Sequence, residues 1–444
     1  MVAPVLLDRL METSVRKGAR AADVLLVESA TLSLGWREGR VSSPCEGVTT
    51  RLSGRVFLSG GRQAPFAVDL PGPLDAAALL DRADALLDGA IGAAREAPPD
   101  PHAAPADRYD LDVRGRALED RRHRTLTLTD RMEVVTSNVE GCQASDPGVV
   151  PESVEYEESR FSRSFASTRG VSASEASTRY RACATARMGP SGRLHRREIA
   201  TRQFANLASV PFGYELGSRL SVLHRPARPF EAPVPVLMRP SCTAHLVACL
   251  APAFSAASVF DGRSFLAGLL GQRLASPLLH VIDDPGLPGA LESRSFDDQG
   301  VPPSPVVILR EGVVAGLFVD PRTARARHLQ PTGHVVGGET RPSNLVVRPG
   351  GRTRNAIGMD LRDYLVLDTF HRPEPLDRTT GHLDTPCDCI VYRNHKAEGA
   401  LLGLSLSLPV RSLLSSVVEV AADQARYGEV DACTLVIGGL ELGA

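Results

Sequence analysis

The sequence predicts an α+β protein with two parts. Residues 1–230 are expected to form an α+β domain with an antiparallel sheet and flanking helices, and residues 231–444 a β-rich domain. Three observations lead to this prediction. A chain of 444 residues is too long for one ordinary domain, strand patterns follow one another without the regular helix-strand alternation of a parallel sheet, and the proline-rich stretch 225–241 separates the halves.

The first hundred residues indicate a compact unit of helices and strands. Apolar residues at helical spacing predict a helix over 4–18. A strong helical pattern covers 74–97 and ends before the breaker "PPDPHAAP". Between these helices the pattern predicts strands at 22–29 and 31–41, and two more within 47–68 around a Gly-Gly turn.

The amino-acid composition changes in the middle of the chain. A helix is predicted over about 115–131, and the stretch 132–200 is rich in Ser, Thr and Arg. Such a stretch can be disordered, but the interleaved Tyr, Phe and Val favour long antiparallel strands with one solvated face. The segment "GPSGRLHRR", residues 189–197, is predicted to be a turn or hairpin tip.

The C-terminal half is predicted to be mostly strands. A strand over 234–240 precedes a helix that contains His245. Gly312 is expected at a hairpin turn, 344–351 to form a strand and turn, and 410–423 to contain a helix.

Composition excludes several classes of function. The net charge is about −2, with 50 basic against 52 acidic residues, so no basic field is expected to attract nucleic acid. The sequence has no long apolar run and no signal-peptide pattern, so no membrane association is expected and the protein is predicted to be cytoplasmic. Its eight cysteines are then expected to be free thiols.

His245 is a candidate metal ligand because it lies in "CTAHLVACLAPA" beside two cysteines. A zinc helix carries two His side chains that share the metal and a Glu that acts as general base. Here Leu246 follows His245, Cys249 lies four residues on, and Leu250 five residues on. The set is incomplete, so the sequence favours a core position over a metal site.

Two other groups of residues invite a chemical interpretation. His382, Cys387, Cys389 and His395 could hold zinc, because the two thiols of a Cys-x-Cys strand point the same way. The alternative is a strand with two small buried thiols. Asp297 and Asp298 could serve acid-base chemistry or bind a cation, although adjacent aspartates more often make a turn.

Several ordered motifs resemble those of one family. The matching pieces are "GQRLAS", "IDDP", "SRSFDDQGVP", "VILREGVVAG", "TARA", "PTGH", "PSNLVVRPG" and "ACTLVIGGLEL". Their order and spacing are similar to those of the TldD/PmbA proteins, also called TldD/TldE and labelled "modulator of DNA gyrase". The N-terminal "ADVLLVESATLSLGWREGRV" and the helix at 74–96 also fit, so the resemblance extends over the whole chain.

The resemblance implies a peptidase context. TldD and TldE form a heterodimeric zinc metallopeptidase that degrades short or unfolded peptides and matures some peptide natural products. TldD carries a His-Glu-x-x-x-His motif and a C-terminal Cys. On this chain the motif begins at His245, with Leu246 in place of Glu and Leu250 in place of the second His, and Cys433 falls near the Cys.

This chain therefore resembles the TldE/PmbA subunit. The resemblance implies no catalytic residue, metal or cofactor in this chain, zinc in a TldD-like partner, and a shared peptide cavity. The residues expected to line that cavity are Asp297, Asp298, Gly300, Thr332, Gly333 and His334, with turn formation as the alternative. Two other functions stay open: a scaffold that has lost its peptidase role, and an independent metalloenzyme using the cluster of His382, Cys387, Cys389 and His395.

Overall fold

The structure, a computed structural model, describes residues 2–109, 117–440 and 442–443. Its N-terminal half contains one antiparallel sheet in the order β4-β3-β1-β5-β6-β7, with β2 paired to the end of β1. This confirms the predicted α+β class and the antiparallel sheet. The strands are β1 (Ala21–Arg37), β2 (Arg40–Val41), β3 (Cys45–Leu58), β4 (Arg62–Pro71), β5 (Val149–Ser167), β6 (Ser172–Met188) and β7 (His195–Thr201).

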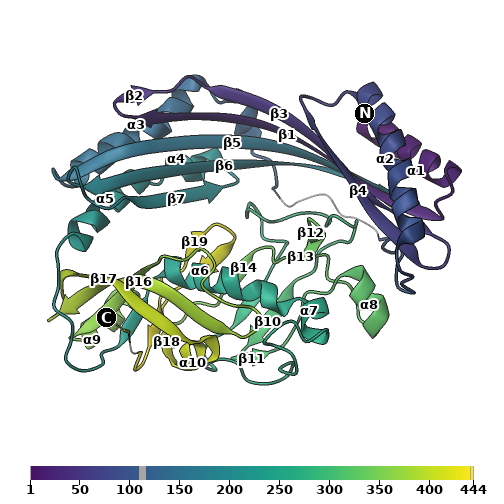
Figure 1. The fold of residues 1–444 in the computed structure, drawn as a ribbon. Helices are drawn as coiled ribbons and strands as arrows, with labels where there is room; N and C mark the ends of the chain where they lie inside the picture. Colours follow the sequence, from purple (N-terminus) through teal and green to yellow (C-terminus); the bar gives the residue numbers. More distant parts are fainter. Residues whose placement is uncertain (1, 110–116, 441, 444) are drawn as a thin grey trace.

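Side-chain alternation gives this sheet two different faces. Even-numbered residues of β1, such as Val24 and Leu34, pack against the helices, because successive side chains of a strand point to opposite faces. On the opposite face Leu25 packs with Phe165 and Phe296, a residue of the C-terminal half. The helices are α1 (Val2–Arg16), α2 (Ala76–Glu96), α3 (Leu128–Ser145), α4 (Phe204–Ala208) and α5 (Phe212–Leu223). The sheet arches over the C-terminal half (Figure 1).

Two element predictions in this half are wrong. The strands expected at 22–29 and 31–41 are one strand, β1, because its pairing with β3 and β5 continues through residues 29–31. Of the helix expected over 115–131, residues 115 and 116 lie outside the described part. A short 3-10 helix spans Arg121–Thr125, and α3 then begins after the capping box of Thr127 and Asp130. It runs to Ser145, into a stretch predicted as strand.

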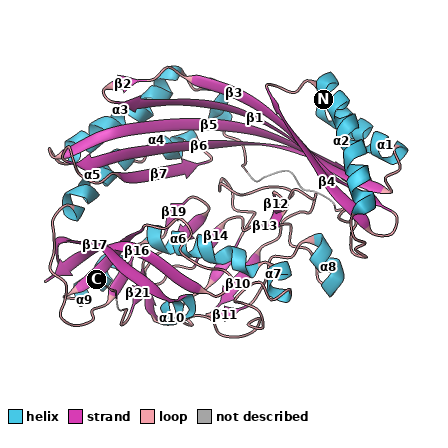
Figure 2. Cartoon of the chain, in the orientation of Figure 1, coloured by secondary structure: helices cyan, strands magenta, loops and turns pink. Residues whose placement is uncertain are grey.

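The C-terminal half is rich in strands, as predicted (Figure 2). Two six-stranded sheets have the orders β11-β10-β9-β14-β20-β19 and β17-β16-β15-β8-β21-β18. The first contains β9 (Val281–Asp283), β10 (Val306–Arg310), β11 (Val313–Val314), β14 (Leu345–Val347), β19 (Ala425–Tyr427) and β20 (Val430–Ala432). The second contains β8 (Val236–Met238), β15 (Tyr364–Phe370), β16 (His382–Arg393), β17 (Lys396–Pro409), β18 (Val417–Val420) and β21 (Leu435–Ile437).

The remaining elements surround a large apolar core. A two-stranded hairpin joins β12 (Val335–Val336) to β13 (Glu339–Thr340). The helical segments are α6 (Pro240–Leu250), η2 (Ala251–Phe254), α7 (Ala256–Phe260), α8 (Pro321–Arg327), α9 (Arg354–Asp360) and α10 (Val410–Ser415). The helix predicted over 410–423 ends at Ser415, and β18 takes the rest, so this prediction holds for its first part only. The hairpin turn predicted at Gly312 is confirmed between β10 and β11.

A buried arginine fastens the arched sheet to the C-terminal half. Arg202 is 4% exposed and follows β7. Its guanidinium donates to the carbonyl oxygens of Leu118 at 3.0 Å, Ala290 at 2.9 Å and Ser293 at 3.2 Å. Burial lowers the pKa of Arg202 to about 10, so the group stays charged at neutral pH. The contacts hold the sheet above the loop at 290–293.

Among the helices in the described residues, we find none that is both long and apolar enough to cross a lipid bilayer.

Candidate functional site

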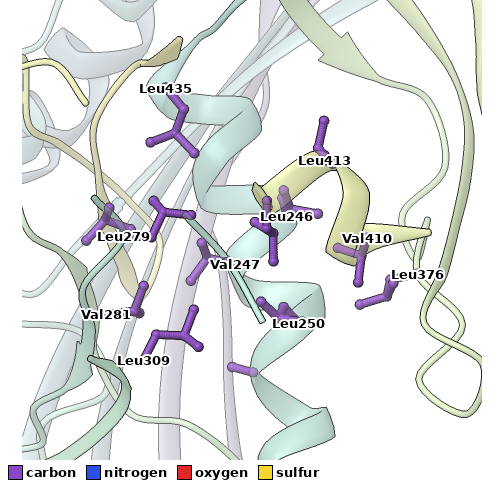
Figure 3. Packing of buried hydrophobic residues seen from close by; sticks show 14 of the residues in the cluster. Leu246, Val247, Leu250, Leu279, Val281, Leu309, Leu376, Val410, Leu413 and Leu435 are labelled. Atoms are coloured by element: carbon purple, nitrogen blue, oxygen red, sulfur yellow. The ribbon is translucent and has the colours of Figure 1, made fainter. Parts of the chain in front are cut away.

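Helix α6 carries the positions that a zinc motif would occupy. It begins with Pro240 at its first turn, where the missing N–H costs nothing. Leu246 and Leu250 are 0% and 1% exposed and belong to the main core. Figure 3 shows them among apolar side chains that include Val410 and Leu413 of α10. The two positions therefore face the interior, where they hold leucine side chains and no metal ligand.

His245 lies on another side of α6 and is half-buried. Its Nε2 lies 2.7 Å from the carbonyl oxygen of Pro373, which is an acceptor, so Nε2 carries the proton. Its ring meets Phe370 edge-on at 5.8 Å between centroids. Cys249, one turn later, points the same way and lies 3.6 Å from the same oxygen. Burial raises the pKa of Cys249 to about 11, so it is a thiol at neutral pH.

These residues do not fit a zinc ion. His245 and Cys249 supply at most two donor atoms and the two leucines supply none, whereas a zinc site has three or four protein ligands. Cys433 is fully buried, donates to the carbonyl oxygen of Val347 at 3.7 Å, and has a pKa raised by burial to about 12. Within the described ranges, no three His, Cys, Asp or Glu side chains form a group able to hold a metal.

The second candidate cluster is spread along one strand. His382 begins β16 and is exposed, with Nε2 lying 3.0 Å from the Ser407 hydroxyl. His395 follows the other end of β16, so the two imidazoles cannot share an ion. Cys387 and Cys389 are both fully buried at a bulge between them. Contact with the Cys387 thiol and burial raise the pKa of Cys389, which agrees with a pair of neutral core thiols.

Asp297 and Gly300 take part in a turn, which is the alternative that the sequence left open to a cavity-lining role. Asp297 is fully buried, and its carboxylate accepts hydrogen bonds from the backbone N–H groups of Gln299 at 2.9 Å, Val301 at 3.0 Å and Val335 at 3.0 Å. Burial raises its pKa. Gly300 has φ +75°, and a Cβ there would collide with the Phe165 ring. The loop is therefore a packed turn under the arched sheet.

The segment Thr332, Gly333 and His334 is likewise structural. His334 is fully buried, with Nε2 lying 2.8 Å from a carboxylate oxygen of Asp283 and Nδ1 lying 3.0 Å from the Thr332 hydroxyl. Gly333 has φ +71° and lies too close to Pro303 for a side chain. His334 is therefore buried and hydrogen-bonded within this chain, and a cavity-lining role for it stays a prediction.

Asp298 is the predicted cavity residue that does reach a pocket. Its carboxylate accepts a hydrogen bond from Arg163 of β5 at 2.7 Å and another from the Gly337 N–H at 2.7 Å. It lines a pocket of about 200 Å³ together with Glu292 and Arg294. Asp298 therefore joins the sheet, the pocket and the β12–β13 hairpin.

A larger cavity of about 810 Å³ lies next to this pocket and shares Glu292, Arg294 and Val336 with it. Its wall comes from the end of α6, from η2 and α7, from the β12–β13 hairpin and from the loops around 374 and 429. The lining contains small residues such as Ala248 and Ser255, together with charged residues of both signs. Burial raises the pKa of Glu429, and the charge of Glu292 adds to that effect.

Sequence reasoning missed most of this lining. Glu292, Arg341, Glu374 and Glu429 stand far apart in the chain and meet only in the fold. Three of them adjoin a Gly or Pro, a pattern that recurs throughout the sequence, whereas Glu292 lies between Leu291 and Ser293.

Comparison with known proteins agrees with this architecture. Residues 231–444 match the family described as "PmbA/TldA metallopeptidase C-terminal domain". A protein named "Metalloprotease" from Methanothermobacter thermautotrophicus is 32% identical over 114 residues, which are 24% of this chain and 25% of that protein. The match thus spans about a quarter of that relative's length.

Solved structures are similar over nearly the whole chain. TldE from Thermococcus kodakarensis has a TM-score of 0.84 at 14% identity, covering 99% of this chain and 100% of that one. A Bacteroides thetaiotaomicron protein named as a modulator of DNA gyrase has a TM-score of 0.86 at 18% identity, covering 99% and 98%. At these identities the likeness shows the fold.

Proposed function

We propose that this chain, whose residues 231–444 belong to the PmbA/TldA metallopeptidase C-terminal domain family, is the TldE/PmbA-type subunit, without a metal site, of a heterodimeric TldD/TldE-type zinc peptidase. The partner is a TldD-like subunit that holds zinc. The substrates are short or unfolded peptides, a class that includes the precursor peptides of natural products. This chain supplies part of the chamber in which the peptide is held.

One observation carries the proposal. The positions one and five residues after His245 are leucines packed in the core of the fold. A chain that keeps the family architecture and uses these positions for packing has no place for the base or the second ligand of a zinc peptidase. The hydrolytic chemistry then belongs to another chain.

The 810 Å³ cavity supports the role in peptide binding. Its charged groups of both signs can meet the ammonium and carboxylate groups of a peptide, and its small residues leave room for the backbone. What this chain does in the reaction is to bind and orient the peptide and to exclude water from it. We assign no proton transfer to its residues.

The test is reconstitution with a TldD-like partner. The two chains are purified separately and together, and cleavage of unstructured peptides is followed for each preparation. We expect stable association and cleavage only when both chains are present. Cleavage by this chain alone, or no association with the partner, would contradict the proposal.

A further inference from the structure

Another cavity, of about 300 Å³, lies beside the first turns of α6. It is formed where the tip of the β6–β7 hairpin meets α5, α6 and the end of β15. We call it the Arg193 pocket, after the hairpin residue at its mouth. Leu194 and Phe370 give it an apolar surface, and His245 reaches it from α6.

The lining of the Arg193 pocket is rich in positive charge. It contains the guanidinium groups of Arg193, Arg196, Arg197 and Arg219, against the carboxylates of Glu198 and Asp368. The three imidazoles of His195, His245 and His371 complete its polar surface.

Both carboxylates of the lining are already neutralised. Asp368 is fully buried and accepts from Arg219 at 2.7 Å and from Arg239 at 2.5 Å. Glu198 accepts from Arg181 at 2.8 Å and from Arg196 at 2.7 Å.

Two further carboxylates stand at the margin of the pocket. Glu215 pairs with Arg197 at 3.2 Å, and Asp388 lies 3.9 Å from Arg193. With Arg181 and Arg239 included, these pairs contain six guanidinium groups and four carboxylates, so positive charge is in excess. The remaining positive charge acts on His195, whose pKa is lowered by burial and then by Arg219 and Arg193.

Arg193 offers the donors that an anion needs. Its side chain is 53% exposed, and one Nη donates to Nδ1 of His371 at 2.9 Å. The other ring nitrogen of His371 lies 2.9 Å from the buried Asp388 carboxylate. This contact fixes the orientation of the His371 ring and, through it, the position of the Arg193 guanidinium. A guanidinium has five N–H donors in a planar fork that matches a carboxylate. Within the described chain, the nearby His195 imidazole makes no hydrogen bond, so it is free to add another contact.

We propose that the Arg193 pocket binds a carboxylate of the peptide. The group is either the C-terminal carboxylate or an acidic side chain, since both present the same two oxygens. The inference rests on the proposed function for the nature of the ligand, a peptide. Binding is measured on this chain alone, so its failure is distinct from a failure of the partner role.

The experiment is calorimetric titration of the isolated chain with three probes. These are Ala-Ala-Ala-Leu with a free C-terminus, the same peptide as its C-terminal amide, and the amide of Ala-Ala-Glu-Leu. We expect the amide without Glu to bind about ten-fold more weakly than the better of the other two, because it lacks the charge-assisted hydrogen bonds. Whichever of the two binds tightly identifies the source of the carboxylate.

Variants connect the effect to the pocket. Arg193→Gln should remove the ten-fold preference and Arg193→Lys should keep part of it, because lysine retains the charge but not the fork. Arg51→Gln is the matched control, since the Arg51 side chain is 56% exposed and pairs with Asp69 on the arched sheet, away from the pocket. Thermal unfolding of each variant confirms that it is folded.

Three results would overturn the inference. They are equal binding of acid and amide, no saturable binding of any probe, and an Arg193→Gln variant that keeps the preference of the parent. Saturation by inorganic phosphate, without preference among the peptides, would also overturn it and would make the pocket a phosphate site.

Discussion

The core side and the cleft side of helix α6 differ in what they contribute. On the core side, Leu246 and Leu250 are buried among side chains of α10 and the sheets. On the cleft side, His245, Ala248 and Cys249 are half-buried and reach the two cavities or the Pro373 carbonyl group. This difference indicates that the core side of α6 stabilises the fold, whereas the cleft side is the one that can contact a ligand.

The largest expected effect follows from placing a charge on the core side. Leu246→Glu should lower the free energy of unfolding by at least about 3 kcal/mol, because a buried carboxylate without a partner is costly. Urea denaturation measures the loss. Ala248→Glu, on the cleft side of the same helix, should cost less than about 1 kcal/mol. Equal losses in the two variants would break the comparison.

A smaller loss is expected from truncation on the core side. Leu250→Ala should destabilise the protein by about 2–4 kcal/mol, since the removed atoms leave a cavity in a packed interior. Leu250→Met keeps the volume and should cost less than about 1.5 kcal/mol. The urea concentrations at the midpoints of unfolding of the two variants measure this difference. A midpoint for Leu250→Ala equal to that of the parent would contradict a packed core at this turn.

On the cleft side, removal of the imidazole should have little effect on stability. His245→Ala loses a hydrogen bond to Pro373 and a ring contact, and should cost about 1 kcal/mol. The rate of peptide cleavage by the reconstituted complex should fall by less than about ten-fold, because His245 lines the Arg193 pocket but is not a metal ligand in this account. A drop in that rate of a hundred-fold, with the fold intact, would assign His245 to the chemistry.

The smallest effect concerns thiol reactivity. Burial raises the pKa of Cys249 to about 11 and that of Cys433 to about 12. Thiolates are the reactive form, so alkylation of Cys249 by iodoacetamide should be slow at pH 8 and rise about ten-fold for each pH unit until about pH 11. Mass spectrometry of peptides follows this rise. The fully buried Cys433 should stay unmodified in the folded chain, and fast alkylation of Cys249 at pH 7 would show that the cleft side is more open.

Local patterns predicted much of the fold. Alternation and turn residues gave the long strands β3 to β6 and the hairpin tip before β7, because these depend on neighbours in the chain. Helix α3 was missed where the capping box of Thr127 and Asp130 outweighed a polar, strand-like composition. The strands and the start of α3 both depend on interactions between residues that are close in the sequence.

The site was less predictable because its residues meet only in the folded chain. The burial of Asp297 and His334 depends on backbone N–H groups and on Asp283, which are distant in sequence. The motif "GRLHRR" was recognised as a hairpin tip, but its approach to Asp368 and His371 depends on the arch of the sheet. The identity of the motif at His245 came from resemblance, and the structure adds which side of α6 each position faces.

The most direct test of the central claim is the zinc content of the chain purified alone. After incubation with one equivalent of zinc and desalting, plasma mass spectrometry gives the metal per chain, and the same measurement is made on the complex with a TldD-like partner. The account predicts no stoichiometric zinc in this chain and about one zinc per heterodimer in the complex. One tightly bound zinc in the isolated chain would contradict it.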